Sequence, residues 1–472
     1  MRTLILLIFF CNSALAITES QKVTSVYDPN FDIDSNVANF SQSVDIASDF
    51  AVVGNPFRNT QNPYMHPNVY VYKKNDSDVW DIFQKLIPSD QSSKPSTFGS
   101  AVAISNNNNK SIAVFDSCGS DLQVPYNNCR SAIYIFEMNA DGFWEEAQKI
   151  SPSENDPNWY GLCFSCGISL AIHGNTFVIG NKLEENKNEI VGGLLIFERA
   201  LSGVWNKTQT IYGPAGQSDT FFPWDIDIHN NKIIASNTLD SENLSRSGAV
   251  YFYEKDGSFW YESQTIKPND SYQYQYFGES ISLSDTNIFV GDKGYGKSHT
   301  PSLSNLPPVP GSAYVFSLNK EDLSWYQSQK IFAPATYAHN AFGASVSVSN
   351  NAAVITAAYP RLQNDPLNFG YGYAHLYLKD ETGIWREREI LTASNDTNPG
   401  FGETAAILGS DIIIGHDRKI ENNIHWWGAA YFYNSNQLVT SVPAMGGIGL
   451  LALGLSMLGL GAVRLRKKIN YK

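Results

Sequence analysis

A tryptophan recurs along most of this 472-residue chain at intervals of 55 to 65 residues. The series consists of Trp80, Trp144, Trp205, Trp260, Trp325 and Trp385. Four positions after each tryptophan the chain has Gln or Glu, and six positions after each it has Leu or Ile. A pattern kept in step at three positions over six copies marks an internal repeat, so the chain is expected to fold as an array of similar units.

One copy of the repeat, starting at Phe277, contains four strand-like segments. "FGESISLS" alternates apolar and polar residues, and "IFVG" is an apolar run that follows a short turn. "GSAYVFSL" and the tryptophan-led "WYQSQKIF" complete the copy. Other copies have Asp-Gly between their last two segments, at 141–142 and 256–257, which is a strong hairpin signal. Four short strands in about 60 residues are typical of one propeller blade.

The number of blades follows from the starts of the first strand. These are Phe40, Phe98, Cys166, Phe222, Phe277, Phe342 and Phe401. There are seven starts but only six tryptophan-led outer strands, so one outer strand is missing. "ESQKVTS" from Glu19 matches "ESQTIKP" from Glu262, and it supplies that strand from the N-terminus. We therefore predict an all-β, seven-bladed β-propeller of four-stranded antiparallel blades over residues 17–438, closed by its N-terminal strand so that no blade edge is left open.

The motifs "FG", which opens four of the seven copies, and "VVGNP" at 52–56 resemble the FG-GAP repeat. This repeat is the blade unit of integrin α-chain heads and of many bacterial surface proteins. Cys166 and Phe222-Pro223 depart from the motif in two blades. The resemblance implies a surface propeller that binds a protein or glycan partner without catalysis.

Several proteins that this repeat resembles bind Ca²⁺ through an alternating D-x-D-x-D-G loop, since carboxylate oxygens suit a hard cation. None of the corresponding loops of this chain has that alternation, and Asp240 and Glu242 are the best ligands that they offer. We expect no metal site and no cofactor.

The two ends of the chain have the patterns of targeting segments. "MRTLILLIFFCNSALA" has a basic start, an apolar stretch and an Ala-Leu-Ala cleavage site, which predicts a signal peptide over 1–16. Ala444–Val463 carries no charge and precedes Arg464 and further basic residues, which predicts a transmembrane helix within 439–472 and a basic cytoplasmic tail. The segment also resembles bacterial C-terminal sorting signals, and whether it is retained or cleaved stays open. The propeller is expected outside the membrane, secreted through the Sec route.

Four cysteines remain after signal-peptide removal: Cys118, Cys129, Cys163 and Cys166. In a secreted chain we expect disulfides, with free thiols or a redox-active CxxC as the alternatives.

Charge and motifs argue against several functions. A formal net charge of −13 disfavours nucleic-acid binding. "GDKGYGKS" from Gly291 matches a phosphate-binding loop, but the proline-rich stretch after it cannot begin a helix, so nucleotide binding is not expected. No GxSxG or HExxH motif occurs, and we expect a non-enzymatic adhesion module. An extracellular polysaccharide hydrolase or lyase and a structural envelope spacer are the alternatives.

Aromatic residues gather in the loops that connect second to third strands and one blade to the next, which share one face of a propeller. They suit stacking on sugars or anchoring a protein. The candidate ligand-binding residues are Trp159, Tyr160, Trp224, Tyr272, Tyr274, Tyr276, Tyr337, Trp426 and Trp427. The three tyrosines from Tyr272 share one side of the chain if that segment is extended.

Overall fold

The computed structural model describes residues 19–24, 40–56, 67–90, 96–105, 110–116, 131–151, 169–181, 185–186, 189–190, 192–214, 222–242, 244–295, 309–333, 341–358, 372–393, 400–421 and 424–436. Thr18–Asn434 forms one compact unit. The predicted signal peptide, the predicted membrane segment and the four cysteines lie outside the described residues. Within the described residues, the structure has no helix of the length and apolar character that a membrane span requires.

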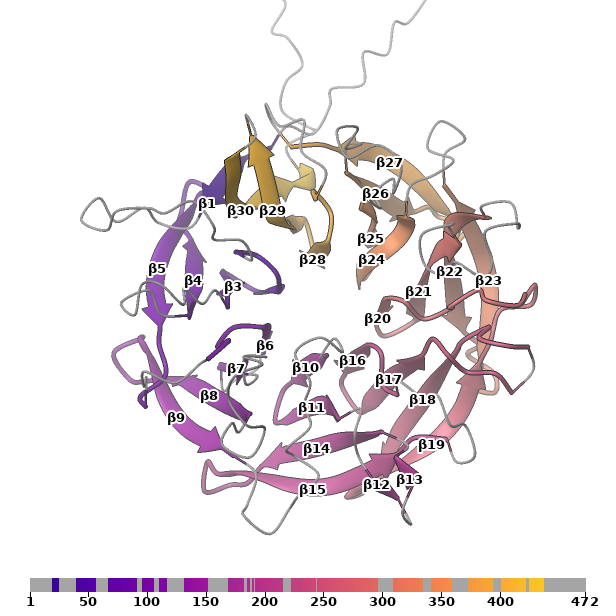
Figure 1. Cartoon of the computed structure of the whole chain (residues 1–472), viewed down its shortest axis with the longest axis horizontal. Helices are drawn as coiled ribbons and strands as arrows, with labels where there is room; N and C mark the ends of the chain where they lie inside the picture. Colours follow the sequence, from indigo (N-terminus) through magenta and orange to yellow (C-terminus); the bar gives the residue numbers. More distant parts are fainter. Residues whose placement is uncertain are drawn as a thin grey trace, which may run out of the picture. The chain divides into compact units, whose positions relative to one another are not determined.

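Seven four-stranded antiparallel sheets are arranged as the blades of a ring around a central axis (Figure 1). Blade 1 contains β2 (Val44–Ala47), β3 (Phe50–Asn55), β4 (Asn68–Lys74) and β5 (Trp80–Leu86). Blade 2 contains β6 (Ala101–Ser105), β7 (Ser111–Asp116), β8 (Ala132–Met138) and β9 (Trp144–Ile150). Blade 3 contains β10 (Leu170–His173), β11 (Thr176–Asn181), β14 (Gly193–Arg199) and β15 (Trp205–Tyr212).

Blade 4 contains β16 (Ile226–His229), β17 (Lys232–Asn237), β18 (Ala249–Asp256) and β19 (Phe259–Ile266). Blade 5 contains β20 (Ile281–Leu283), β21 (Asn287–Tyr295), β22 (Val309–Leu318) and β23 (Trp325–Phe332). Blade 6 contains β24 (Ala341–Ser349), β25 (Ala352–Ala358), β26 (Tyr373–Lys379) and β27 (Trp385–Leu391). Blade 7 contains β28 (Thr404–Leu408), β29 (Asp411–Glu421), β30 (Ile424–Asn434) and β1 (Gln21–Thr24), and β12 (Glu185–Asn186) with β13 (Glu189–Ile190) forms a separate short hairpin. The predicted seven-bladed all-β architecture is confirmed.

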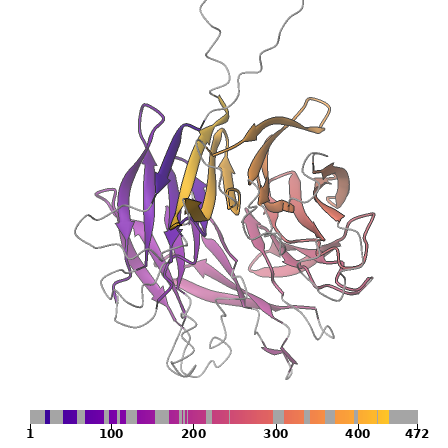
Figure 2. The ribbon, with the colours of Figure 1, turned by 45° about the horizontal axis from the view of Figure 1, so that its top comes forward.

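The N-terminal strand closes the ring, as predicted. β1 pairs antiparallel with β30, with Gln21 opposite Phe432 and Thr24 opposite Ala429. Figure 2 shows the first strand, in indigo, beside the last strands, in yellow. Pairing of the first and last segments leaves blade 7 with the same number of strands as the other blades.

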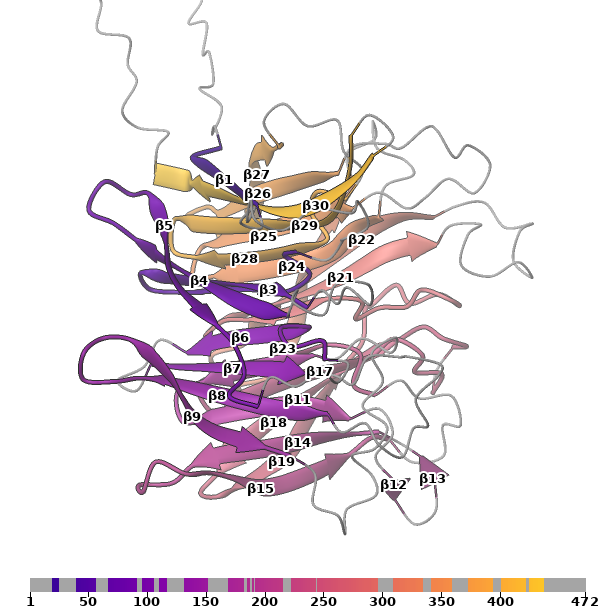
Figure 3. The same ribbon diagram turned by 60° about the vertical axis from the view of Figure 1, so that its left-hand side comes forward.

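The two faces of the ring differ in the connections that they carry. Turns from first to second strands and from third to fourth strands lie on one face, which we call the hairpin face; the β4–β5 and β8–β9 hairpins project there, at the left of Figure 3. Connections from second to third strands and between blades lie on the other face, which we call the loop face. The β12–β13 hairpin belongs to the loop face, at the right of Figure 3.

Each tryptophan of the repeat lies buried between neighbouring blades and is held there by the glutamine of the blade before it. The side-chain amide of Gln21 donates to the carbonyl of Trp80 and accepts from its N–H, at 2.7 and 2.8 Å. The same pair of bonds joins Gln84 to Trp144, Gln148 to Trp205, Gln209 to Trp260, Gln264 to Trp325 and Gln329 to Trp385. The Gln four residues after each Trp therefore makes the contact with the next blade, whose Trp it binds.

The Phe-Gly pair that opens a repeat also has an inter-blade role. Phe277 is completely buried in the core between blades 4 and 5, and Phe98 takes the corresponding place between blades 1 and 2. The glycine after each phenylalanine has a positive φ, 93° at Gly99 and 88° at Gly343. A Cβ on Gly343 would lie 2.5 Å from the carbonyl oxygen of Ser312, so no other residue fits that position without movement of the backbone.

Candidate functional site

A cavity of about 490 Å³ lies on the axis of the ring and is bordered by all seven blades. Its walls come from the starts of the first strands, β2, β6, β10, β16, β20, β24 and β28 (Figure 1). Each of these strands begins where an inter-blade connection ends, so the cavity lies toward the loop face. We call it the axial cavity.

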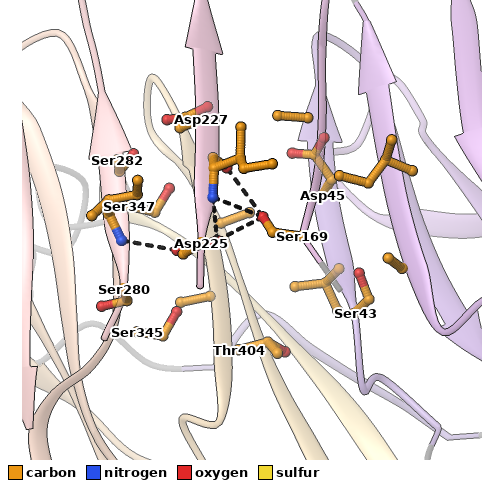
Figure 4. A pocket seen from close by; sticks show the side chains of 18 of the residues that line it. Ser43, Asp45, Ser169, Asp225, Asp227, Ser280, Ser282, Ser345, Ser347 and Thr404 are labelled. Carbon is orange, nitrogen blue, oxygen red and sulfur yellow. Dashed lines mark hydrogen bonds between the residues drawn. The ribbon is translucent and has the colours of Figure 1, made fainter. Parts of the chain in front are cut away.

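The polar positions of the first strands supply the side chains of the axial cavity. The third residue after each repeat start is Ser43, Ala101, Ser169, Asp225, Ser280, Ser345 or Thr404, and the fifth is Asp45, Ala103, Ala171, Asp227, Ser282, Ser347 or Ala406. Figure 4 shows the polar members of both sets around the axis. Most are small, as seven strands converging on one axis require, and the three aspartates are the exceptions.

The three aspartates hold neighbouring first strands together. Asp227 accepts from the N–H of Ile228 in its own strand at 2.8 Å and from that of Leu283 in blade 5 at 2.7 Å. Asp45 and Asp225 each make the corresponding two bonds, Asp45 to Ile46 and Ile104, and Asp225 to Ile226 and Ile281.

Serines of the axial cavity have a related role, as in the bond from the N–H of Val102 to Ser43 Oγ at 3.0 Å. The first strand is the inner edge of each sheet, and these side chains satisfy N–H groups that its own sheet leaves unpaired.

The axial cavity gathers several acidic side chains. Burial, together with the negative charges of Asp225 and Asp45, raises the pKa of Asp227 to about 7. Burial likewise raises the pKa of Asp45 to about 6 and that of Asp225 above its usual range. Of the described residues that line the cavity, none is Lys, Arg or His, while Glu279 and Glu403 add two more acidic groups. The axial cavity is therefore acidic, and its potential becomes more negative as the pH rises through the pKa values of these aspartates.

One of the aromatic residues predicted to bind ligand lies at this cavity. Trp224 lines it and is half-buried, and its Nε1 donates to the carbonyl of Glu279 at 3.1 Å. Its backbone N–H bonds to the carbonyl of Ser236 at 2.7 Å, which fixes the start of blade 4.

The segment from Tyr272 to Tyr276 is not extended, so the expectation that its three tyrosines share one side does not hold. Tyr274 and Tyr276 have φ values of 61° and 56°, and Gln275 between them is completely buried. The hydroxyl of Tyr272 donates to the buried carboxylate of Asp292 at 3.1 Å. Tyr272 is thus anchored in blade 5, while Tyr274 and Tyr276 are half-buried at the loop face.

The two carboxylates considered for Ca²⁺ are paired with a lysine. Lys267 Nζ lies 3.1 Å from Asp240 Oδ1 and 2.7 Å from Glu242 Oε2, and Asp240 also accepts from the hydroxyl of Tyr251 at 2.7 Å. The lysine ammonium supplies the positive charge that Asp240 requires as a completely buried group. Nowhere in the described part of the chain do three or more His, Cys, Asp or Glu residues come together as metal ligands would.

The other predicted positions give less information. Trp159, Tyr160 and Tyr337 lie outside the described residues, as do Cys118, Cys129, Cys163 and Cys166. Trp426 and Trp427 lie in β30, where their backbones pair with Lys419 and Arg418. The axial aspartates were not predicted from the sequence, although the alternation in "SVDIAS" and "WDIDIH" indicated them, because the polar residues of a first strand point to the axis.

Comparison with known proteins identifies no family for the chain. No model of a protein family matches the chain, and no curated protein does. A "putative 6-phosphogluconolactonase" from Bacteroides uniformis is similar in structure with a TM-score of 0.46 at 10% identity, over 75% of this chain and 86% of that one. A protein from Lactobacillus plantarum has a TM-score of 0.41 at 10% identity, over 78% and 88% of the two chains. A Trypanosoma rangeli sialidase has a TM-score of 0.38 at 9% identity, over 90% of this chain and 58% of the sialidase.

These comparisons correct one expectation. Two of the three similar structures carry the names of enzymes, so the inference from the sequence that this propeller is not an enzyme was wrong and is withdrawn. Similarity at this level concerns the fold alone and assigns no reaction to the chain. The resemblance to the FG-GAP repeat remains a prediction, because no family model supports it.

Proposed function

We propose that this protein is a cell-surface β-propeller that binds an extracellular carbohydrate on its loop face, at the mouth of the axial cavity. The observation that carries the proposal is the axial cavity itself. Its volume of about 490 Å³ lies within the range of small-molecule sites, roughly 300–1,000 Å³. Its walls offer hydroxyl and carboxylate groups from seven blades and, among the described lining residues, no basic side chain.

The chemistry of these walls selects among ligands. Serine and threonine hydroxyls both donate and accept, and carboxylates accept, which suits the many hydroxyls of a sugar. Five acidic residues disfavour anionic saccharides and phosphates and favour neutral or amine-bearing ones. Trp224 adds an aromatic surface beside the polar groups.

The location at the cell surface is inferred from the predicted signal peptide at 1–16 and the predicted membrane segment at 444–463. In the propeller, β30 ends and β1 begins on the hairpin face. These two strand ends therefore lie on the face opposite the mouth of the axial cavity.

A second candidate, polysaccharide hydrolysis, is favoured by one observation. A carboxyl group with a pKa near neutrality is suited to general acid catalysis, and burial brings the pKa of Asp227 to about 7. Both oxygens of Asp227 are, however, engaged by backbone N–H groups of blades 4 and 5. The geometry therefore supports carbohydrate binding at the axial cavity better than hydrolysis by Asp227.

The test uses full-length protein in detergent and three matched oligosaccharides. We expect the tetramers of N-acetylglucosamine and of glucosamine to bind, and the tetramer of galacturonic acid not to bind. Analysis of the bound sugars for cleavage separates the two candidates, because shortened products would establish the hydrolase and displace simple binding. Failure of all three to bind would contradict a carbohydrate function.

A further inference from the structure

Three bulky residues close together on the loop face have a positive φ. The other described non-glycine residues with positive φ are Ser48, Asp78, Asn230, Leu323 and Asn350, which lie in tight turns of the hairpin face, and Ser41, which precedes β2. Arg246, Tyr274 and Tyr276, with φ values of 51°, 61° and 56°, lie together above blade 4. Bulky side chains rarely adopt this conformation, which persists only where the surroundings impose it.

Hydrogen bonds on two sides of the segment impose this conformation on Tyr274 and Tyr276. The N–H of Tyr274 bonds to the carbonyl of Ser245 at 2.8 Å, and that of Tyr276 to the carbonyl of Arg246 at 3.1 Å. The side chain of Gln275 turns inward and donates to Asp292 and to the hydroxyl of Tyr314, at 3.1 and 2.8 Å. The segment is therefore fixed from both sides.

The strained tyrosines have no polar role in the fold that would require them. Neither hydroxyl forms a hydrogen bond to a described residue, and both side chains are partly exposed. Glycine would adopt the same backbone without strain. A chain with tyrosine at two such positions keeps the aromatic side chains at a cost in stability, which is typical of ligand-contact sites.

The segment is connected directly to the axial cavity. Three residues after Tyr276, Glu279 lines the cavity, and its carbonyl accepts from Trp224 Nε1. Tyr274 and Tyr276 thus lie on the connection that leads, along the chain, into the cavity wall.

We infer that Tyr274 and Tyr276 form a rigid aromatic contact for a carbohydrate at the rim of the axial cavity, an inference that rests on the proposed function. Aromatic faces pack against the C–H groups of sugar rings. Holding the rings in place before binding lowers the ordering cost that a flexible loop would add. The left-handed backbone conformation fixes how the segment presents the two tyrosine rings.

The experiment compares a Tyr274→Gly/Tyr276→Gly variant with Asn350→Gly, which changes a residue with φ of 53° in a turn on the hairpin face. We expect the melting temperature of both variants to stay unchanged or to rise by about 1–2 °C, because glycine relieves the strain. We expect binding of the N-acetylglucosamine and glucosamine tetramers to fall by about tenfold or more in the double variant only. A Tyr274→Asn/Tyr276→Asn variant, which also accepts this backbone, should behave as the glycine variant does.

Two results would overturn the inference. A fall of the melting temperature by more than about 5 °C in both tyrosine variants, with Asn350→Gly unaffected, would show that the rings stabilise the fold. If the double variant binds as well as the unaltered protein does, Tyr274 and Tyr276 are not part of the binding site, and the proposed function still stands. Absence of binding by the unaltered protein would instead contradict the proposed function, and the inference with it.

Discussion

The side-chain amide of Gln264 in blade 4 spans both backbone groups of Trp325 in blade 5, with Nε2 2.8 Å from the carbonyl oxygen and Oε1 2.8 Å from the amide nitrogen. The same arrangement recurs at six blade interfaces in the described part of the ring. It explains why the sequence keeps Gln four residues after Trp. Each such Gln lies in the outer strand of its own blade and positions the outer strand of the next blade.

Replacement of Gln264 by Leu removes both bonds and leaves the backbone of Trp325 without these partners. We expect a loss of about 1–3 kcal/mol in the free energy of unfolding, measured by denaturant titration. Thr265→Leu, at the exposed neighbouring position of β19, is the matched control and should change little. Equal stability of the two variants would contradict the inter-blade role of Gln264.

Deletion of Glu19–Thr24 removes β1 and exposes the edge of β30. Because the deletion also removes the bonds from Gln21 to Trp80, blade 7 and its contact with blade 1 should both weaken. We expect a lower melting temperature and a larger fall than Gln21→Leu alone produces, as followed by circular dichroism. An unchanged melting curve would show that the ring does not depend on closure by its N-terminal strand.

Replacement of Gly343 by Ala should destabilise the ring strongly. The added Cβ would lie 2.5 Å from the carbonyl of Ser312 in blade 5 and would hold a φ of 88°. We expect a loss above about 2 kcal/mol. Gly142→Ala is the control, since Gly142 has a φ of 84° but no neighbour within 4 Å, and strain alone should cost about 1–2 kcal/mol there. Similar losses in both variants would contradict the close-contact explanation for the Phe-Gly motif.

Stability should fall as the pH rises through neutrality. The folded state binds protons more tightly than the unfolded state at Asp45 and Asp227, whose pKa values burial raises from 3.8 to about 6 and about 7. Between pH 4 and 7 such groups favour the folded state at the lower pH. His173, whose pKa burial lowers, contributes in the opposite sense.

We therefore expect a higher melting temperature at pH 6 than at pH 7.5, by an amount reduced because the axial aspartates are partly accessible. Asp227→Asn should narrow the difference between the two temperatures. A higher melting temperature at pH 7.5 would indicate that these carboxylates are not raised in pKa.

The repeat predicted the fold because its signals are local and are repeated in every blade. The Trp and Gln positions fix an outer strand, and the match between 19–25 and 262–268 identified the closing strand before any contact was known. The alternation of "SISLS" predicts a strand but does not say which way its polar side chains point. That direction depends on the ring, which brings Asp45 near Asp227 although blades 1 and 4 lie far apart in the sequence.

The loop residues could not be predicted in the same way. Tyr272, Tyr274 and Tyr276 alternate with polar residues, which favours an extended segment in isolation. Hydrogen bonds from the N–H groups of Tyr274 and Tyr276 to the carbonyls of Ser245 and Arg246, together with the inward turn of Gln275, impose a different backbone. The pairing of Asp240 with Lys267 likewise depends on a contact between a loop and the end of an outer strand. Tertiary contacts of this kind have no period in the sequence.

The most direct test of the account is binding of the N-acetylglucosamine and glucosamine tetramers to full-length protein with Ser345→Arg. Ser345 lines the axial cavity, and an arginine there would fill part of it and add a positive charge. Thr208→Arg, on the exposed outer strand β15, makes the same change of charge away from the axis. We predict that both tetramers bind the unaltered protein and the Thr208 variant equally and bind the Ser345 variant at least about tenfold more weakly. Equal binding to all three would place the ligand elsewhere and contradict the axial site.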